Sequence, residues 1–147
     1  MSHHDIAGML NGLLADYMVY YQKLRNYHWN VKGKEFFKLH EKFEEAYNEA
    51  ATFVDDIAER ILALDAKPYS TMAEFVEHAE LDEDHGSPGH EAMVRNLIAD
   101  IETLNSRSFD ITEGAEEHRD RTTANLLDDI VDAQEERKWM FKQFLAS

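Results

Sequence analysis

The stretch that decides the fold is NYHWNVKGKEFFKLHEKFEEAYNEAATFVDDIAERI, which runs from residue 26 to residue 61. Gly33 divides it, and apolar side chains recur at steps of three and four positions on both sides of this glycine. Such spacing is typical of amphipathic helices. The first predicted helix begins at Ile6 and ends near Gly33, and the second ends before Lys67 and Pro68. Their apolar positions are Ile6, Leu10, Leu14, Tyr17, Tyr21 and Leu24, then Phe36, Phe43, Tyr47, Val54, Ile57 and Ile61.

Two more long helices are predicted in the second half of the chain. Ser87 and Pro88 are typical of an N-cap and a first helical position, so the third helix should begin there and break near Gly114. Asp120 is expected to cap the fourth helix, which runs almost to the last residue. Their apolar positions are Val94, Leu97, Ile101, Leu104 and Ile111, then Leu127, Ile130, Val131, Phe141 and Leu145.

A long connection, residues 66–87, separates the two pairs of helices. Within it, Thr71 and Glu74 are spaced as a capping box that opens a short helix to about Ala79. Four long helices with short links within each pair and one long crossover are typical of the ferritin-like four-helix bundle. A chain of 147 residues with only 2 prolines and 6 glycines is suited to a single all-α domain. We therefore expect one ferritin-like domain over residues 1–147, with the short extra helix in the crossover between helices 2 and 3.

Composition excludes several classes of function. The chain has 30 acidic and 15 basic residues and a formal net charge of -15, which repels nucleic acid and membrane surfaces and attracts cations. It has no cysteine, which excludes disulfides, thiolate metal sites and cysteine nucleophiles. The first residues lack the basic and apolar regions of a signal peptide, and no stretch is long enough to span a membrane. We expect a cytoplasmic protein.

Four potential metal ligands share one side of the second helix. His40, Glu44, Asp55 and Glu59 follow one another at intervals that keep them within an arc of roughly 100°. Imidazole and carboxylate together are ligands of redox-active iron. The same pattern is also typical of a solvated acidic face, and spacing alone does not decide between the two. His28 continues the apolar face of the first helix, where a single histidine is most often a hydrogen-bonded core residue.

The spacing of these ligands indicates that one chain cannot complete a site. Glu44 and Asp55 lie ~16 Å apart along a helix axis. However, the midpoint between His40 and Glu59 along the helix is the same as the midpoint between Glu44 and Asp55. An antiparallel copy of the helix that crosses at this midpoint would therefore place His40 and Glu44 of one chain opposite Asp55 and Glu59 of the other. Such a two-fold dimer has two identical sites. Ala46, Ala50 and Ala51 surround this crossing and are expected to permit close approach, and His28 is expected to fold back towards His40 across the Gly33 turn.

A two-metal site inside one bundle is the competing arrangement. It requires Glu-x-x-His on two of the helices. The second and fourth predicted helices have no such motif. Glu74 and His78 are four positions apart in the crossover and do not qualify.

These residues resemble the Dps family, the miniature ferritins also called DNA-protection-during-starvation proteins. The resemblance covers nearly the whole chain and is carried by His28-Trp29, Phe36 to Glu44, Asp55 to Arg60, Pro68 to Phe75 and Trp139-Met140-Phe141. It implies a hollow homododecamer built from two-fold dimers, with two iron-oxidising centres at each dimer interface. It also implies a ferroxidase that oxidises Fe(II) to Fe(III), preferably with hydrogen peroxide, stores ferric oxide in the cavity and protects against oxidative stress.

The resemblance also implies a role for each candidate residue of a two-iron ferroxidase centre. His28 of one subunit would bind the stronger iron with Asp55 and Glu59 of the other, while His40 and Glu44 would bind the weaker iron. Glu44 departs from the family, which commonly has aspartate there. Trp29 corresponds to a family tryptophan that intercepts stray oxidising equivalents, and the alternative for it is an aromatic residue packed at a helix end.

DNA binding, the family's second activity, is not expected here. In the family it usually relies on a tail rich in lysine and arginine, whereas the first basic residue after the terminal histidines is Lys23, inside the first helix. His3 and His4 are expected to lie in a disordered end rather than to bind metal. Glu116, Glu117 and Asp120 lie near the position of the acidic pore by which iron enters family members. The rival functions are a DNA-binding, nucleoid-packing protein with a vestigial metal site and a plain helical interaction module.

Overall fold

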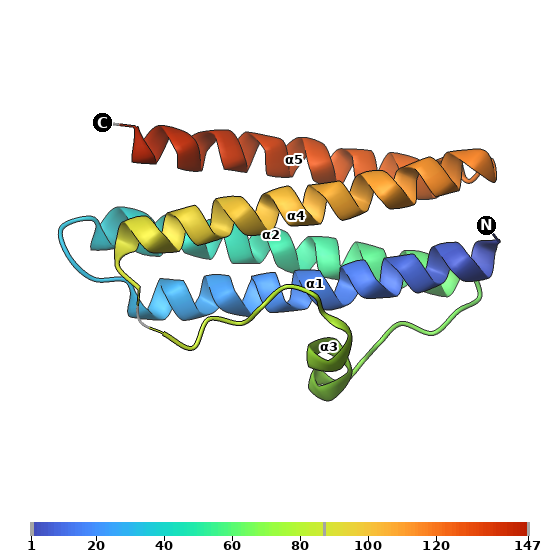
Figure 1. The fold of residues 1–147 in the computed structure, drawn as a ribbon, viewed down its shortest axis with the longest axis horizontal. Coiled ribbons are helices and arrows are strands. Elements are labelled where there is room, and N and C mark those ends of the chain that lie inside the picture. The colour runs from blue at the N-terminus through green and yellow to red at the C-terminus, as the bar shows by residue number, and fades with distance from the viewer. Residues whose placement is uncertain (1, 87, 147) are drawn as a thin grey trace.

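The computed structural model describes residues 2–86 and 88–146 of the chain. In this part of the chain there are five α-helices and no strands, and the four long helices form a bundle (Figure 1). The expected all-α, ferritin-like architecture is therefore confirmed, including the short helix in the crossover. The helices are α1 (His3–Asn30), α2 (Phe36–Ala63), α3 (Met72–His78), α4 (His90–Glu117) and α5 (Arg121–Leu145).

Helix α1 begins three residues earlier than the apolar pattern predicted. Ser2 is its N-cap and accepts a hydrogen bond from the backbone N–H of Asp5, whose carboxylate in turn accepts one from the backbone of Ser2. This capping box satisfies N–H groups that a helix start otherwise leaves unpaired. The expectation of a disordered end at His3 and His4 is therefore wrong, because both residues lie in the first turn of α1.

The boundaries of α4 also differ from the sequence prediction. Ser87 lies outside the described residues, and the helix begins at His90 with Gly89 as its N-cap, so Pro88 precedes the helix rather than opening it. The helix does not break at Gly114, because one glycine costs a helix only about 1 kcal/mol. It ends instead at Glu117, two residues before Arg119, whose left-handed φ of 60° lets the Asp120 backbone N–H bond to the Ala115 carbonyl at 2.8 Å.

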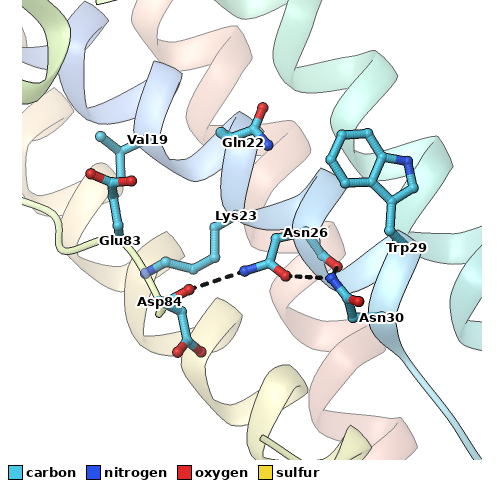
Figure 2. A pocket seen from close by; sticks show the side chains of 8 residues that line it. All are labelled: Val19, Gln22, Lys23, Asn26, Trp29, Asn30, Glu83 and Asp84. Carbon is cyan, nitrogen blue, oxygen red and sulfur yellow. Dashed lines mark hydrogen bonds between the residues drawn. The ribbon is translucent and has the colours of Figure 1, made fainter. Parts of the chain in front are cut away.

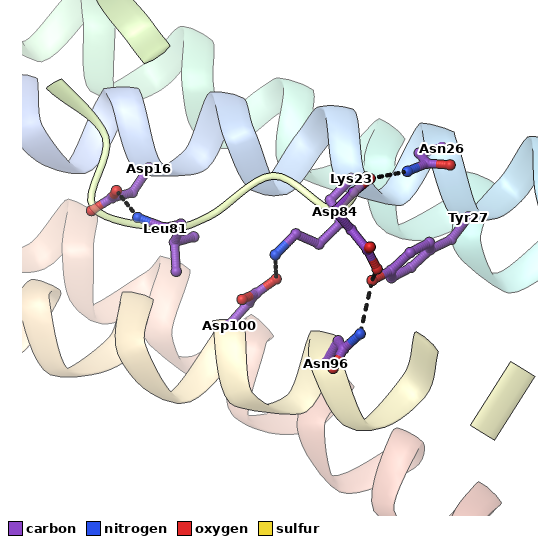
Figure 3. Close-up of polar contacts among 8 residues, drawn as sticks. All are labelled: Asp16, Lys23, Asn26, Tyr27, Leu81, Asp84, Asn96 and Asp100. Atoms are coloured by element: carbon purple, nitrogen blue, oxygen red, sulfur yellow. Dashed lines mark hydrogen bonds and ion pairs between the residues drawn. The ribbon is translucent and has the colours of Figure 1, made fainter. Parts of the chain in front are cut away.

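Polar side chains of α1 form hydrogen bonds that hold the crossover against this helix (Figure 3). The buried Asp16 carboxylate accepts the backbone N–H groups of Glu80 at 2.7 Å and Leu81 at 3.0 Å. Further along α1, the Tyr27 hydroxyl donates to the Asp84 carboxylate at 2.5 Å. The two bonds to Asp16 satisfy backbone N–H groups of the crossover that would otherwise require water. Within the crossover, Thr71 and Glu74 form the predicted capping box of α3.

A buried ion pair connects α2 with the start of α5. Arg60 donates to Asp120 Oδ1 at 2.8 Å and to Thr123 Oγ1 at 2.9 Å. The same Asp120 carboxylate accepts the backbone N–H of Thr123 at 3.1 Å, which confirms it as the N-cap of α5. Because its side chain is 5% exposed and both oxygens are bonded within the chain, Asp120 is not free to line the acidic pore that the family resemblance implies. Within residues 2–86 and 88–146, no helix is long and apolar enough to cross a membrane.

Removing the charge of Asp120 should destabilise the fold in a pH-dependent way. Burial alone would raise the pKa of Asp120, but the hydrogen bonds from Thr123 and the Arg60 charge outweigh it and lower the pKa. The carboxylate therefore stabilises the fold fully above its unfolded pKa of about 3.9, and this contribution is lost as the pH falls through the lower folded pKa. We expect Asp120→Asn to lower the free energy of unfolding by about 1–3 kcal/mol at neutral pH.

Thermal unfolding of both proteins at neutral and acid pH measures this effect. The difference in Tm between wild type and Asp120→Asn should narrow in acid. Asp128→Asn, an equivalent change on the exposed face of α5, serves as the control and should leave Tm nearly unchanged. An equal loss in both variants, or a difference that is constant with pH, would contradict this account of Asp120.

Candidate metal centre

The turn between α1 and α2 brings the two predicted histidine ligands together. Val31 leaves the helical conformation, and Gly33 has a φ of 101°, a region that glycine adopts without steric cost. The chain therefore reverses within residues 31–35, and α2 returns antiparallel to α1. His28 on the last turns of α1 then faces His40 near the start of α2, as the sequence predicted.

The two imidazole rings form a stacked, hydrogen-bonded pair. Their centroids are 3.8 Å apart and their planes differ by 10°. Nδ1 of His28 lies 2.6 Å from the carbonyl oxygen of His40, and Nδ1 of His40 lies 2.7 Å from the carbonyl oxygen of His28. Because a carbonyl oxygen only accepts, each Nδ1 must carry the proton. In the neutral rings both Nε2 atoms therefore keep a lone pair, which is the form of histidine that binds a metal.

Two aromatic neighbours hold this pair, although the sequence pattern assigned them only to the apolar face of the second helix. Phe36 stacks against His40 with centroids 4.8 Å apart, and Tyr47 contacts the His28 ring edge-on at 5.3 Å. Phe36 precedes His40 by one helical turn and Tyr47 follows it by two, so the helical period was the available signal. Ring contacts on both histidines restrict their rotation, which favours a fixed direction for each Nε2.

Glu44 is the third predicted ligand near the turn. Its Oε1 lies 3.7 Å from His28 Nε2, and about half of its side chain is exposed. That distance is too long for a hydrogen bond and allows an ion pair only when the histidine is protonated. His28, His40 and Glu44 of one chain thus form one cluster, with the carboxylate directed towards the histidine pair.

Asp55 and Glu59 form a second, separate cluster further along α2. Both side chains are exposed. Hydrogen bonding with Asp55, and then the negative charge of Asp55, raise the pKa of Glu59. A bound cation would relieve this repulsion between two adjacent carboxylates. The helical rise places this cluster ~16 Å from Glu44, as the sequence spacing required.

No metal-binding group is complete within the single chain. Across residues 2–86 and 88–146, no three histidine or acidic side chains are arranged to hold a metal ion. The expectation that Ala46, Ala50 and Ala51 all line the crossing of two α2 helices is wrong for two of them. Ala46 and Ala50 are buried in the core of their own bundle, whereas Ala51 is exposed on the side of Glu44 and Asp55. The helical period explains the error, because positions 46 and 50 fall on the apolar face with Phe43 and Phe53.

Trp29 lies on the outer side of α1, away from the bundle core. Its side chain is 57% exposed, and the Arg25 guanidinium carbon lies 5.0 Å from its ring centroid. Figure 2 shows its indole at the edge of a polar cleft of about 320 Å³, which is also lined by Lys23, Asn26 and Asp84. The ring is therefore neither buried in the helix packing nor shielded from solvent in the single chain.

Several known proteins share sequence and fold with the chain over nearly its whole length. Residues 7–147 match the family model of the ferritin-like domain. General stress protein 20U of Bacillus subtilis is 45% identical over 136 residues, which is 92% of this chain and 94% of the relative. DNA protection during starvation protein 2 of Bacillus anthracis is 42% identical over 141 residues, 96% of this chain and 97% of the relative.

Solved structures agree with these relatives. A Dps protein from Bacillus brevis superposes with a TM-score of 0.96 at 38% identity, covering 99% of this chain and 100% of the other. A DPS protein from Vibrio cholerae, described as a member of the ferritin-like diiron-carboxylate superfamily, gives a TM-score of 0.95 at 38% identity over 98% of this chain and 91% of the other. With the histidine turn, the ferritin-like bundle and these matches together, the chain belongs to the Dps family.

Proposed function

We propose that the chain is a ferroxidase subunit whose iron-oxidising sites form between two copies of it. The observation that carries this proposal is the arrangement of the two clusters on one side of α2. At one end, His28 and His40 use Nδ1 for hydrogen bonds to the backbone and leave Nε2 available to a metal, and the Asp55–Glu59 pair lies towards the other end. An antiparallel partner helix would bring the histidine cluster of one chain opposite the acidic pair of the other, twice, by two-fold symmetry.

Each candidate residue has a distinct part in the proposed reaction. His28, Asp55 and Glu59 hold the first Fe(II), and His40 with Glu44 holds the second. The two flexible methylene groups of Glu44 and its half-exposed side chain make the second position the weaker one. Two Fe(II) ions and one hydrogen peroxide, with two protons, give two Fe(III) ions and two water molecules. The carboxylates favour the ferric product because hard oxygen ligands neutralise its higher charge.

Assembly and storage follow from the same proposal. The subunits form a closed homododecamer of two-fold dimers, and ferric oxide accumulates in its cavity. The exposed indole of Trp29, next in sequence to His28, is proposed to take up oxidising equivalents that escape the site. Removing both ferrous iron and peroxide protects the cell against oxidative damage. The proposal is tested by measuring the loss of ferrous iron after stoichiometric peroxide is added and by measuring the mass of the assembly. A stable monomer that oxidises no iron would overturn the proposal.

Single substitutions should rank the two iron positions. His28→Ala, Asp55→Ala and Glu59→Ala should each slow peroxide-driven iron oxidation by at least about 10–100-fold, because even outer-shell partners of metal ligands contribute that much. Glu44→Ala should slow it less. Asp56→Ala, which removes an exposed carboxylate beside Asp55, is the matched control and should retain the wild-type rate. Stopped-flow absorbance of the ferric product measures each rate, and equal losses at all four ligand positions would show that the ranking is wrong.

Mixing two inactive variants tests whether the site is shared between chains. One variant lacks His28 and His40, and the other lacks Asp55 and Glu59. In a mixed dimer one site loses both halves, while the other takes its histidines from the second variant and its acids from the first. Random pairing makes half of the dimers mixed, so co-assembled shells should recover about a quarter of the normal activity. Mixed shells, verified by mass spectrometry, that stay as inactive as either parent would exclude an inter-subunit site.

DNA binding is the rival function, and the structure gives it little support. The first lysine of the chain, Lys23, is buried and bonded to Asp100 at 2.9 Å, so it is not available to phosphates.

We expect no gel shift of plasmid DNA at neutral pH and physiological salt, because the net charge of -15 opposes binding. The strongest local exception is a group of exposed lysines, Lys32 and Lys34 in the α1–α2 turn and Lys38 in the first turn of α2. A clear shift that is lost in a Lys32→Glu, Lys34→Glu variant would refute the charge argument and assign binding to this turn.

A further inference from the structure

The interior of the bundle contains a layer of uncharged polar side chains that the proposed iron chemistry does not use. Tyr17 and Tyr20 come from α1, Asn105 from α4 and Gln134 from α5, and each is at most 3% exposed. Gln134 Nε2 donates to the Tyr17 hydroxyl at 3.4 Å, which joins α5 to α1 across the core. Polar groups in such a position are costly unless their hydrogen bonds are satisfied.

Ion pairs between α1 and α4 show that these residues occupy one level of the bundle. Lys23 bonds to Asp100 on one side of the level, and Asp16 pairs with Arg107 on the other. Tyr17 and Tyr20 lie between the two α1 residues of these pairs, and Asn105 lies between the two α4 residues. Phe53 of α2 closes the remaining side through an edge contact with Tyr17 at 5.8 Å. All four long helices therefore contribute to the layer.

Several atoms of this layer have no hydrogen-bond partner. Among the described residues, none is found for the Tyr20 hydroxyl, for both amide atoms of Asn105 or for Gln134 Oε1, and all four are inaccessible to solvent. They include hydrogen-bond donors and acceptors from three different helices. Buried polar atoms in folded proteins are nearly always paired, and internal water supplies the partner where the protein does not.

The chemistry of the layer selects a neutral ligand. Neither a carboxylate nor an unpaired cation belongs to it, since the neighbouring Glu49 and Arg137 are bonded to each other at 3.0 Å. Burial raises the pKa of Tyr20 well above its ordinary value, so its phenol remains protonated and does not act as an anionic metal ligand. A small neutral molecule that both donates and accepts hydrogen bonds matches the unpaired donors and acceptors, whereas an ion would be left without a counter-charge.

We propose that Tyr20, Asn105 and Gln134 form a binding site for internal water in the centre of each bundle. The bound water bridges α1, α4 and α5 and fixes their relative positions at this level. This site is separate from the proposed iron positions at the surface of α2 and does not depend on them.

A high-resolution crystal structure and a count of internal water test this site in the assembled protein. Ordered solvent should lie within hydrogen-bond distance of the Asn105 amide and the Gln134 carbonyl. By ¹⁷O magnetic relaxation dispersion, Asn105→Leu should have fewer slowly exchanging water molecules per subunit than wild type. Asn11→Leu is the matched control, because the Asn11 amide is already bonded to the backbone of Lys67 and Tyr69, and its water count should not change.

Two results would overturn the site. One is electron density in which the Asn105 and Gln134 amides bond directly to each other or to Tyr20 with no solvent between them. The other is a water count that is the same in wild type and in folded Asn105→Leu shells. If Asn105→Leu does not assemble, Gln134→Leu and the wild-type crystal structure give the same decision.

Discussion

The helical rise of α2 is the constraint on which the rest of the structure depends. It places His40 and Glu44 at one end of a rigid rod and Asp55 and Glu59 further along it, on the same side. No side chain spans the ~16 Å between Glu44 and Asp55, and bending an uninterrupted helix enough to close this gap would break its backbone bonds. The fold thus presents two incomplete clusters, and any metal chemistry that uses both must involve a second chain.

The turn at Gly33 connects this fold to the chemistry of its histidines. Because His28 and His40 each donate Nδ1–H to the other's backbone carbonyl, the path of the main chain sets the tautomer of both rings. In many metal sites a carboxylate performs this role from a separate element. Here the same two hydrogen bonds join the end of α1 to the start of α2, so the stability of the turn and the orientation of both Nε2 atoms have one cause.

Local patterns in the sequence predicted most of the fold and the approach of His28 to His40. Contacts between residues far apart in the sequence determine the features that these patterns missed. Helical spacing identified all four long helices, and the Thr71–Glu74 capping box identified α3, because these signals act within a few residues. The predicted start at Ile6 and the predicted break near Gly114 were wrong, because a capping box at Ser2 and Asp5 and the left-handed Arg119 set these two helix ends. The bonds from Asp16 to Glu80 and Leu81 join residues more than sixty positions apart, which no local pattern encodes.

The buried ion pairs explain why metal chemistry would take place at the surface of this bundle and not in its centre. Among the described residues three acids are buried, Asp16, Asp100 and Asp120, and they are paired with Arg107, Lys23 and Arg60, respectively. A carboxylate already neutralised by a cation of its own chain offers little charge to a metal, and releasing it would leave that cation without its partner. Asp55 and Glu59 have no such partner among the described residues, and they repel each other. Negative charge available to a metal therefore remains on the outer face of α2. A second subunit packed against this face would shield it from solvent and complete a metal site there.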